Sequence, residues 1–248
     1  MAKMTKQDVL LEITCVDDLW DLNVPDYYSD RDISEDELSH IFTLCDALWL
    51  HSGDPKQPHA ELTSGKCSDG FVDVLRVLCF TNLCEIFGNM LVNNFRRYMG
   101  SQLKTTNADW VIGSDHAGAD LSHSVALELL SKHDFTEKGP DKTQVWKRFT
   151  IQPEEVVLQV EELITTTKTL RAVREGIRNG NPYPVQFTPV VMTLVHRSDT
   201  YEFEGFPILY GIHYDIKTWE PKECPLCAQG SKRMRPKTIE GWAKLTGK

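Results

Sequence analysis

The sequence predicts an α/β fold in which helices flank a parallel β-sheet. Two segments, residues 106–130 and 156–177, each combine an apolar strand, a turn of small or hydroxyl-bearing residues and an amphipathic helix. Residues 189–196 and 206–213 have the length and composition of further strands. A β-branched run such as residues 156–160 avoids water only when both of its faces are covered, which is typical of a parallel sheet.

The composition indicates a globular protein without a nucleic-acid or membrane partner. The 248 residues can bury a core of their own, and a net charge of −9 disfavours non-specific binding to nucleic acids or anionic membranes. No apolar run approaches the roughly 18 residues of a membrane helix, and no signal-peptide segment follows residues 1–6. Seven scattered cysteines fit reduced thiols better than a disulfide framework. We therefore expect a cytoplasmic protein.

The pattern of the first hundred residues predicts two helices and a pair of strands. Ser34 and Glu37 have the spacing of a capping box, and the apolar periodicity after them predicts a helix that runs to about His51. Residues 59–73 predict a strand, a tight polar turn and a second strand, and residues 81–99 predict a helix packed on a sheet.

The segment at residues 106–130 predicts a strand, a loop from Ser114 to Asp120 and a helix from Leu121. Backbone N–H groups at the start of such a helix attract an anion. His116 is more typical of a polar turn than of a catalyst. Asp115 would repel a bound anion unless Mg²⁺ lay between them, so it is a candidate metal contact through water.

The second such segment is the stronger candidate for a phosphate site. The strand at residues 156–160 should end at Glu161 and Glu162, and a hydroxyl-rich turn at residues 165–169 should open the next helix. The positive end of the helix dipole and the free N–H groups would meet at that turn. Phosphate is the expected guest.

Residues 157–169 (VLQVEELITTTKT) resemble the phosphoribosyl-diphosphate (PRPP) signature of type I phosphoribosyltransferases. The acidic pair and the Thr-Thr step match that signature. Glu162 stands where Asp is usual, and Thr167 and Lys168 stand where glycine is usual. If the loop needs positive φ, it is strained without glycine.

Three further segments resemble bacterial orotate phosphoribosyltransferases in the same order along the chain. Residues 62–68 (LTSGKCS) match the family's Ser-Gly-Lys turn in a small hood subdomain over the base, although a lysine in such a turn is also typical of a solvated hairpin. Residues 114–120 correspond to its diphosphate loop, and residues 135–149 to its catalytic loop. Residues 138–142 lack periodicity and predict a mobile lid. The resemblance covers roughly residues 55 to 230.

The resemblance implies transfer of 5-phosphoribosyl from PRPP to a nucleobase, most closely an orotate-like pyrimidine, with release of diphosphate. It implies Mg²⁺ as cofactor and a homodimer that exchanges the lid. The implied catalytic residues are Lys138, Glu161 and Glu162, and the two glutamates would also contact the metal through water. The implied PRPP-binding residues are Ser114, Asp115, Gly118, Lys142, Arg148, Thr165, Thr166, Thr167, Lys168 and Thr169. The implied base-binding residues are Ser64, Lys66 and Phe71.

Cys224 and Cys227 form a Cys-Pro-Leu-Cys motif near the end of the chain. One CxxC motif is half of a structural zinc site, and no second pair with suitable spacing follows. Two reduced cysteines in a tail turn are therefore favoured over zinc. The predicted divisions are residues 1–100 (N-terminal helices and hood), 101–215 (phosphoribosyltransferase core) and 216–248 (C-terminal tail).

Two other functions are open to the same fold. The departures at Glu162, Thr167 and Lys168 would suit a regulatory or scaffold protein that binds PRPP or a nucleotide without turnover. A nucleic-acid-binding regulator is disfavoured by the acidic balance of the chain.

Overall fold

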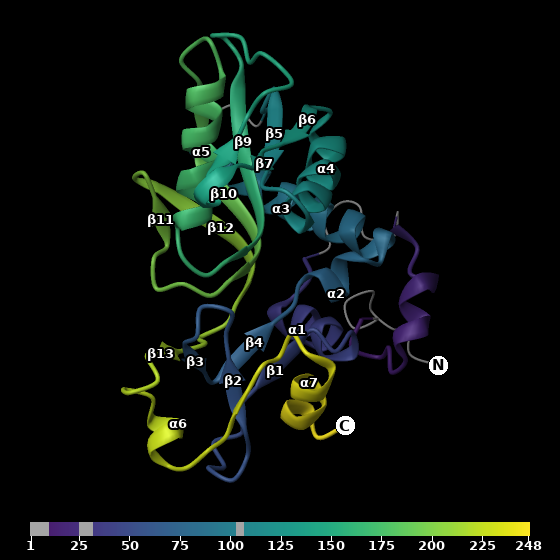
Figure 1. Ribbon diagram of the computed structural model, residues 1–248. Coiled ribbons are helices and arrows are strands. Elements are labelled where there is room, and N and C mark those ends of the chain that lie inside the picture. The colour runs from purple at the N-terminus through teal and green to yellow at the C-terminus, as the bar shows by residue number, and fades with distance from the viewer. Residues whose placement is uncertain (1–9, 25–31, 103–106) are drawn as a thin grey trace, which may run out of the picture.

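The computed structural model describes residues 10–24, 32–102 and 107–248, and a six-stranded sheet lies at its centre (Figure 1). The strand order is β11-β12-β10-β9-β5-β6, and all neighbours are parallel except β11 and β12. The strands are β5 (Trp110–Gly113), β6 (Lys132–Phe135), β9 (Val156–Ile164), β10 (Gln186–His196), β11 (Glu202–Phe203) and β12 (Phe206–His213). The predicted α/β fold with a parallel core is confirmed.

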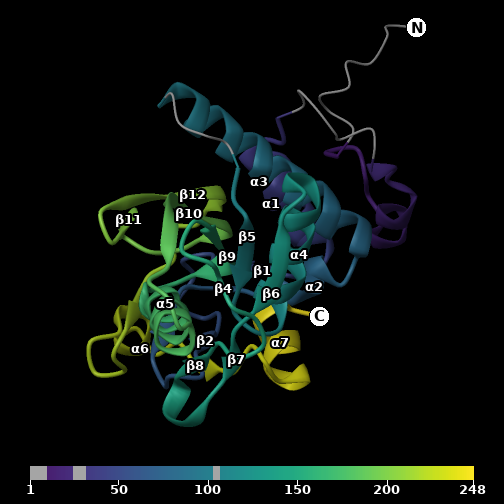
Figure 2. The same cartoon turned by 90° about the horizontal axis from the view of Figure 1, so that it is seen from above.

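Helices cover both faces of this sheet (Figure 2). One face carries α1 (Glu35–Leu44), α3 (Thr81–Ser101) and α4 (Ala117–Leu129), and their apolar sides share a core with β9 and β10. The other face carries α5 (Lys168–Gly180), whose Val173 and Ile177 pack with Trp110 and Trp146. The apolar periodicity predicted for α3 and α5 is confirmed by the burial of these positions.

A second, smaller sheet lies below the first in Figure 1 and takes strands from both ends of the chain. Its order is β13-β3-β2-β14. Its strands are β2 (His59–Glu61), β3 (Cys67–Ser68), β13 (Thr218–Trp219) and β14 (Arg233–Met234). The remaining short helices are η1 (Val16–Asp21) and α2 (Leu75–Leu78), which contribute to the main core, and α6 (Pro225–Ala228) and α7 (Ile239–Thr246) near the end of the chain. The predicted divisions after residues 100 and 215 stay a prediction, but the hood and the tail build one sheet.

The helix predicted from the capping box ends earlier than expected. The box is present, because Glu37 N–H donates to Ser34 Oγ at 3.2 Å and Ser34 N–H donates to the Glu37 carboxylate at 2.9 Å. The helix stops at Leu44, and Asp46 follows with φ 53°. The predicted end near His51 was wrong, because the next apolar residues form β1 (Leu48–Leu50), which pairs with β4 (Gly70–Val72).

The segment predicted as a mobile lid forms the turn of a small hairpin, and its mobility stays a prediction. Strands β7 (Glu137–Lys138) and β8 (Gln144–Val145) pair antiparallel, and the 3-10 turn η3 (Pro140–Lys142) joins them. Strand β8 lies directly against α5, where a Cβ on Gly176 would come within 2.4 Å of the Gln144 carbonyl oxygen. The base of this hairpin is therefore anchored to the core by backbone contact.

Across the parts of the chain that the structure describes, every helix is too short or too polar to cross a membrane. The N-terminal residues 1–6, in which no signal peptide was expected, lie outside the described residues.

Candidate active site

The acidic pair lies on β9 itself. The prediction that this strand ends at Val160 was wrong, because β9 continues to Ile164 and Glu161 pairs with Thr193 of β10. Glu161 is 1% exposed. Its carboxylate accepts hydrogen bonds from Ser114 Oγ at 2.6 Å and from Gln159 Nε2 at 3.3 Å. The central strand of the sheet thus holds one carboxyl group in the floor of the site.

This position is electrostatically costly for two negative charges. Burial, followed by the charge of Glu162, raises the pKa of Glu161 to about 8. Burial also raises the pKa of Glu162, and the charge of Asp115 adds to that effect. A cation bound beside these groups would offset both effects. Gly118 leaves room for it, since a Cβ there would lie 3.2 Å from Glu161 Oε2 and 3.3 Å from Glu162 Oε2.

The expected diphosphate loop connects β5 to α4 and brings Ser114, Asp115 and Gly118 to the acidic pair. Gly113 permits the close turn, because a Cβ there would lie only 2.3 Å from the Gly118 carbonyl oxygen. His116 precedes the first residue of α4 with φ 63° and ψ −125°, a backbone conformation that residues with a Cβ rarely adopt. Asp115 lies 3.3 Å from His116 Nε2 and 3.1 Å from Lys138 Nζ.

The threonine loop opens α5 as predicted, and its backbone is unstrained. Thr167 precedes the first residue of α5, and none of residues 165–169, all of them described, has positive φ. The loop therefore does not adopt the positive φ that would have favoured glycine. Thr165, Thr166, Lys168 and Thr169 are exposed, so their hydroxyl and ammonium groups are available to a ligand at the helix start.

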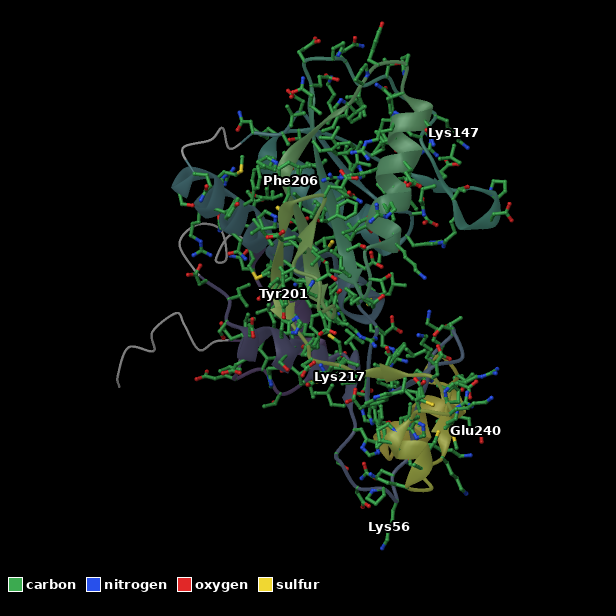
Figure 3. All side chains as sticks on the ribbon, turned by 90° about the vertical axis from the view of Figure 1, so that its left-hand side faces the viewer. Lys56, Lys147, Tyr201, Phe206, Lys217 and Glu240 are labelled. Atoms are coloured by element: carbon green, nitrogen blue, oxygen red, sulfur yellow. The ribbon has the colours of Figure 1, made fainter. Side chains whose placement is uncertain are left out.

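A cavity of about 570 Å³ joins the threonine loop to the hood. Ser64 and Lys66 of the hood line it opposite Thr165, Thr166 and Lys168. Figure 3 shows Lys217, another lining residue, where the core meets the smaller sheet. Residues from the two separate sequence motifs therefore face one space. Lys66 Nζ pairs with the Glu220 carboxylate at 3.0 Å.

Some expected site residues lie elsewhere. Phe71 packs edge-on against Trp242 with ring centroids 6.1 Å apart, and it lines a different cavity of about 250 Å³. Arg148 forms ion pairs with Asp134 and Glu137 instead of facing the cavity. The side chain of Lys142 lies outside the described residues. Lys138 is exposed and reaches the acidic group through Asp115.

Arg197 lines the cavity, although the sequence analysis did not single it out. It directly follows β10, and its N–H donates to the Ile164 carbonyl oxygen at 2.8 Å, beside the threonine loop. Its side chain is buried, and its Nε finds no acceptor among the described residues. A cation placed directly after a parallel strand was the available sequence signal, because ligands collect at that edge of the sheet.

A buried polar network supports Glu161 from behind and was also missed. Arg174 is 1% exposed, and its Nε donates to Gln159 Oε1 at 3.2 Å while Nη1 pairs with Glu204 at 2.6 Å. Gln159 in turn donates to Glu161. Arg174 looks like a surface cation in the sequence because the residues that bury it, Phe187 and Phe203, come from later strands.

Comparison with known proteins places the chain in a family. The chain is 31% identical over 178 residues to the orotate phosphoribosyltransferase of Caldanaerobacter subterraneus subsp. tengcongensis, which covers 72% of this chain and 87% of that protein. It is 26% identical over 204 residues to the orotate phosphoribosyltransferase of Heliobacterium modesticaldum, covering 82% and 98%.

A solved structure agrees at the level of the fold. The crystal structure of orotate phosphoribosyltransferase from Aeropyrum pernix superposes with a TM-score of 0.50 at 18% identity, covering 71% of this chain and 93% of that one. No family model matches the chain. The similarity to the Caldanaerobacter protein extends over most of both chains, so this chain belongs to the orotate phosphoribosyltransferase family.

Proposed function

We propose that the protein transfers the 5-phosphoribosyl group from PRPP to orotate. The bond between ribose C1 and the diphosphate oxygen breaks, a bond from orotate N1 to C1 forms, and the N1 proton leaves to solvent or diphosphate. Positive charge builds on the ribose ring while negative charge builds on diphosphate, so positioned charges and dipoles supply the catalysis.

One observation carries the proposal: the cavity that joins Thr165, Thr166 and Lys168 to Ser64 and Lys66. It offers a phosphate site at one end and hood side chains for a base at the other. The name of the relatives, orotate phosphoribosyltransferase, supports orotate as the base.

The acceptor end of the cavity carries cations that suit the carboxylate of orotate. The buried side chain of Arg197 reaches toward the hood, where its Nη2 lies 3.5 Å from Ser68 Oγ, and its Nε has no acceptor among the described residues. A buried guanidinium gains most from a charged partner. Lys66 would bind the base or the departing diphosphate after exchanging its ion pair with Glu220 for the ligand.

The donor end would hold PRPP through backbone and side chains. The N–H groups and hydroxyls of residues 165–169 would bind the 5-phosphate, with the dipole of α5 favouring its charge. Glu162, with Glu161 beneath it, would accept hydrogen bonds from the ribose hydroxyls. Lys138, whose ammonium lies 3.1 Å from Asp115, would neutralise the leaving diphosphate.

We further propose Mg²⁺ as the cofactor. Asp115, Glu161 and Glu162 form a cluster of carboxyl groups in which burial and mutual repulsion raise the pKa values of the two glutamates. Such an oxygen-rich cluster fits a hard divalent cation bound partly through water. When bound, the ion would supply charge neutralisation for diphosphate oxygens. The cytoplasmic location expected from the sequence stays a prediction.

A homodimer with an exchanged lid also stays a prediction. In the single chain, Lys138 pairs with Asp115 of the same chain, so exchange of the lid requires this ion pair to open.

The test is diphosphate release by the purified chain with PRPP, Mg²⁺ and a panel of bases. We expect release with orotate and much less with uracil, which lacks the carboxylate. Release with no base of the panel, together with tight PRPP binding, would establish the non-catalytic alternative.

Kinetic measurements on variants test whether the cavity binds orotate. Arg197→Lys should raise KM for orotate about tenfold or more while changing KM for PRPP little, because one charge-assisted contact contributes about 1.5–3 kcal/mol. Lys56→Ala, at the far end of the smaller sheet in Figure 3, is the control and should behave as wild type. Equal losses for both substrates would remove Arg197 from the orotate site.

A further inference from the structure

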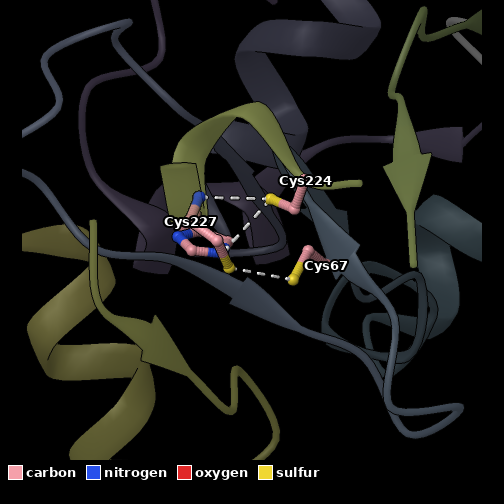
Figure 4. Close-up of side chains that lie close together, drawn as sticks. Cys67, Cys224 and Cys227 are labelled. Atoms are coloured by element: carbon pink, nitrogen blue, oxygen red, sulfur yellow. Dashed lines mark hydrogen bonds between the residues drawn. The ribbon is translucent and has the colours of Figure 1, made fainter. Parts of the chain in front are cut away.

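Four potential metal ligands meet below the cavity, at the junction of the smaller sheet and the tail. His59 comes from β2, Cys67 from β3, and Cys224 and Cys227 flank the start of α6. One ligand atom from each lies within 4.8 Å of all the others. Figure 4 shows the three labelled cysteines converging on one point.

The distances match a tetrahedral zinc site. Zn–S bonds of about 2.3 Å and a Zn–N bond of about 2.0–2.1 Å at tetrahedral angles separate two sulfurs by about 3.8 Å and a sulfur from the nitrogen by about 3.6 Å. Here Cys67 Sγ and Cys227 Sγ are 3.6 Å apart. His59 Nε2 lies 3.7 Å from Cys224 Sγ and 3.4 Å from Cys227 Sγ.

The surrounding hydrogen bonds orient the ligands. Ser231 Oγ donates to the Gln57 carbonyl oxygen at 2.6 Å, so at 2.8 Å it accepts the proton of His59 Nδ1. This leaves the lone pair of Nε2 facing the three sulfurs. A hydrogen bond that fixes the tautomer of a ligating histidine is a usual feature of metal sites. The Cys227 N–H also donates to Cys224 Sγ at 3.4 Å.

A disulfide or a set of free thiols fits the cluster less well than a metal ion does. A disulfide needs sulfurs about 2.05 Å apart, and it would leave the third thiol and the imidazole without a role. His59, Cys67 and Cys224 are almost completely excluded from water. Reduced thiols alone would leave Nε2 of this buried imidazole with only two weak sulfur partners, Cys224 and Cys227. Three sulfurs and one nitrogen are a ligand set that selects zinc.

We propose that His59, Cys67, Cys224 and Cys227 bind one Zn²⁺ ion in a closed, four-ligand structural site. The sequence shows no second ligand pair near the CxxC motif. The pair is His59 and Cys67, which lie eight residues apart and more than 150 residues before Cys224. All four positions are filled by the protein, so no position remains for substrate. The sequence-based preference for two free thiols in a tail turn is thereby replaced.

The ion would fasten the tail to the hood hairpin. Its ligands His59 and Cys67 bracket the turn that carries Ser64 and Lys66 into the cavity. Its ligands Cys224 and Cys227 follow Glu220, the ion-pair partner of Lys66. We infer that zinc holds the base-binding turn in place, and this consequence alone rests on the proposed function.

Metal content tests the site directly. The full chain, purified without a histidine tag under reducing conditions, should retain about one zinc per chain after dialysis. Cys67→Ser and Cys227→Ser should each lower that content at least about fivefold. Cys45→Ser, at another buried thiol, and Cys79→Ser, at an exposed one, are the matched controls and should keep it. Content far below one per chain after reconstitution with Zn²⁺ would overturn the proposal.

Cobalt provides a test that does not depend on the variants folding. Co²⁺ added to the metal-free wild-type chain should produce thiolate-to-cobalt charge-transfer absorption and the strong visible bands of a tetrahedral site. A six-coordinate spectrum without charge transfer would overturn the proposal. Thiol titration of the native chain should show three cysteines that become reactive only after a chelator is added.

The consequence for the active site is measured separately. Zinc removal should raise KM for orotate several-fold more than KM for PRPP, and equal changes would contradict the inferred role of the ion. A zinc-containing chain without transferase activity would refute the proposed function and leave the metal site intact. An active chain that contains no zinc would refute the metal site and leave the proposed function intact.

Discussion

Glu161 holds a carboxyl group at a depth that water barely reaches. Its oxygens are committed to Ser114 and Gln159, and its pKa of about 8 lies well above the ordinary value of 4.5. The sequence could place this residue beside Glu162 but could not show its burial, because the groups that cover it come from β5 and α4.

The raised pKa predicts a pH dependence of stability. The folded chain keeps the Glu161 proton up to about pH 8, whereas the unfolded chain releases it near pH 4.5, so this contribution is present below pH 4.5 and is lost as the pH rises through 8. Glu161→Gln should remove this loss. Between pH 5 and pH 9, wild type should lose on the order of 3 kcal/mol relative to the variant, measured by urea unfolding. Parallel stability profiles would refute the assignment.

His116 predicts a gain in stability from glycine. At φ 63° and ψ −125° its Cβ is unfavourable, and its side chain is exposed. His116→Gly should raise the free energy of unfolding by about 1 kcal/mol, the relief of strain less the added chain entropy. His116→Ala is the control, because it removes the same imidazole and keeps the strain. Equal stability of the two variants would show that the backbone is relaxed.

At the scale of elements, the sequence predicted those parts whose signal is local. The strand, threonine turn and helix at residues 156–177 follow from β-branched residues, hydroxyls and helical periodicity. The helix after Ser34 was extended wrongly, because Leu48 and Trp49 fit a helical period as well as a strand. Only the pairing partner, β4, decides between them. Arg174 and the cluster of four potential metal ligands depend on long-range contacts and have no local signature.

The contact between α5 and the hairpin rests on two glycines. A Cβ on Gly176 would lie 2.4 Å from the Gln144 carbonyl oxygen, and one on Gly180 would lie 2.0 Å from that of Trp146. Gly176→Ala should destabilise the chain by about 1–3 kcal/mol through this overpacking, despite the better helix propensity of alanine. The hairpin carries Lys138, so kcat should fall as well.

Gly100→Ala is the matched control for this prediction. Gly100 also lies in a helix, α3, but a Cβ there would meet nothing within 4 Å among the residues that the structure describes. The control should stabilise the chain by about 0.5–1 kcal/mol and leave kcat unchanged. If thermal unfolding shows both variants to be stabilised, the close contact between α5 and β8 does not exist in solution.

At the scale of the whole molecule, segments that are far apart in the sequence lie side by side in the smaller sheet. Residues 59–68 and the last segment of the chain build one small sheet, and residues beside that sheet share a cavity with the threonine loop. Substrate specificity is therefore shared between distant parts of the sequence. The predicted dimer extends this sharing to a second chain.

Mixed dimers test whether Lys138 acts within its own chain or on a partner. Lys138→Ala and Glu162→Gln chains should each be inactive, and mixing them should restore up to about a quarter of wild-type activity if lids are exchanged, because one of the two sites in each mixed dimer is then intact. Mixing Lys138→Ala chains with Lys138→Ala,Glu162→Gln chains is the control and should restore nothing. No recovery from the first mixture would show that Lys138 serves the Asp115 it contacts here.

The most direct test of the central claim is a crystal structure with the expected product, orotidine 5′-phosphate. We predict the phosphate at the N–H groups of residues 165–169 and the pyrimidine carboxylate within hydrogen-bond distance of Arg197 or Lys66, in the cavity between the two sheets. A product bound outside that cavity, or a phosphate away from the start of α5, would contradict the account.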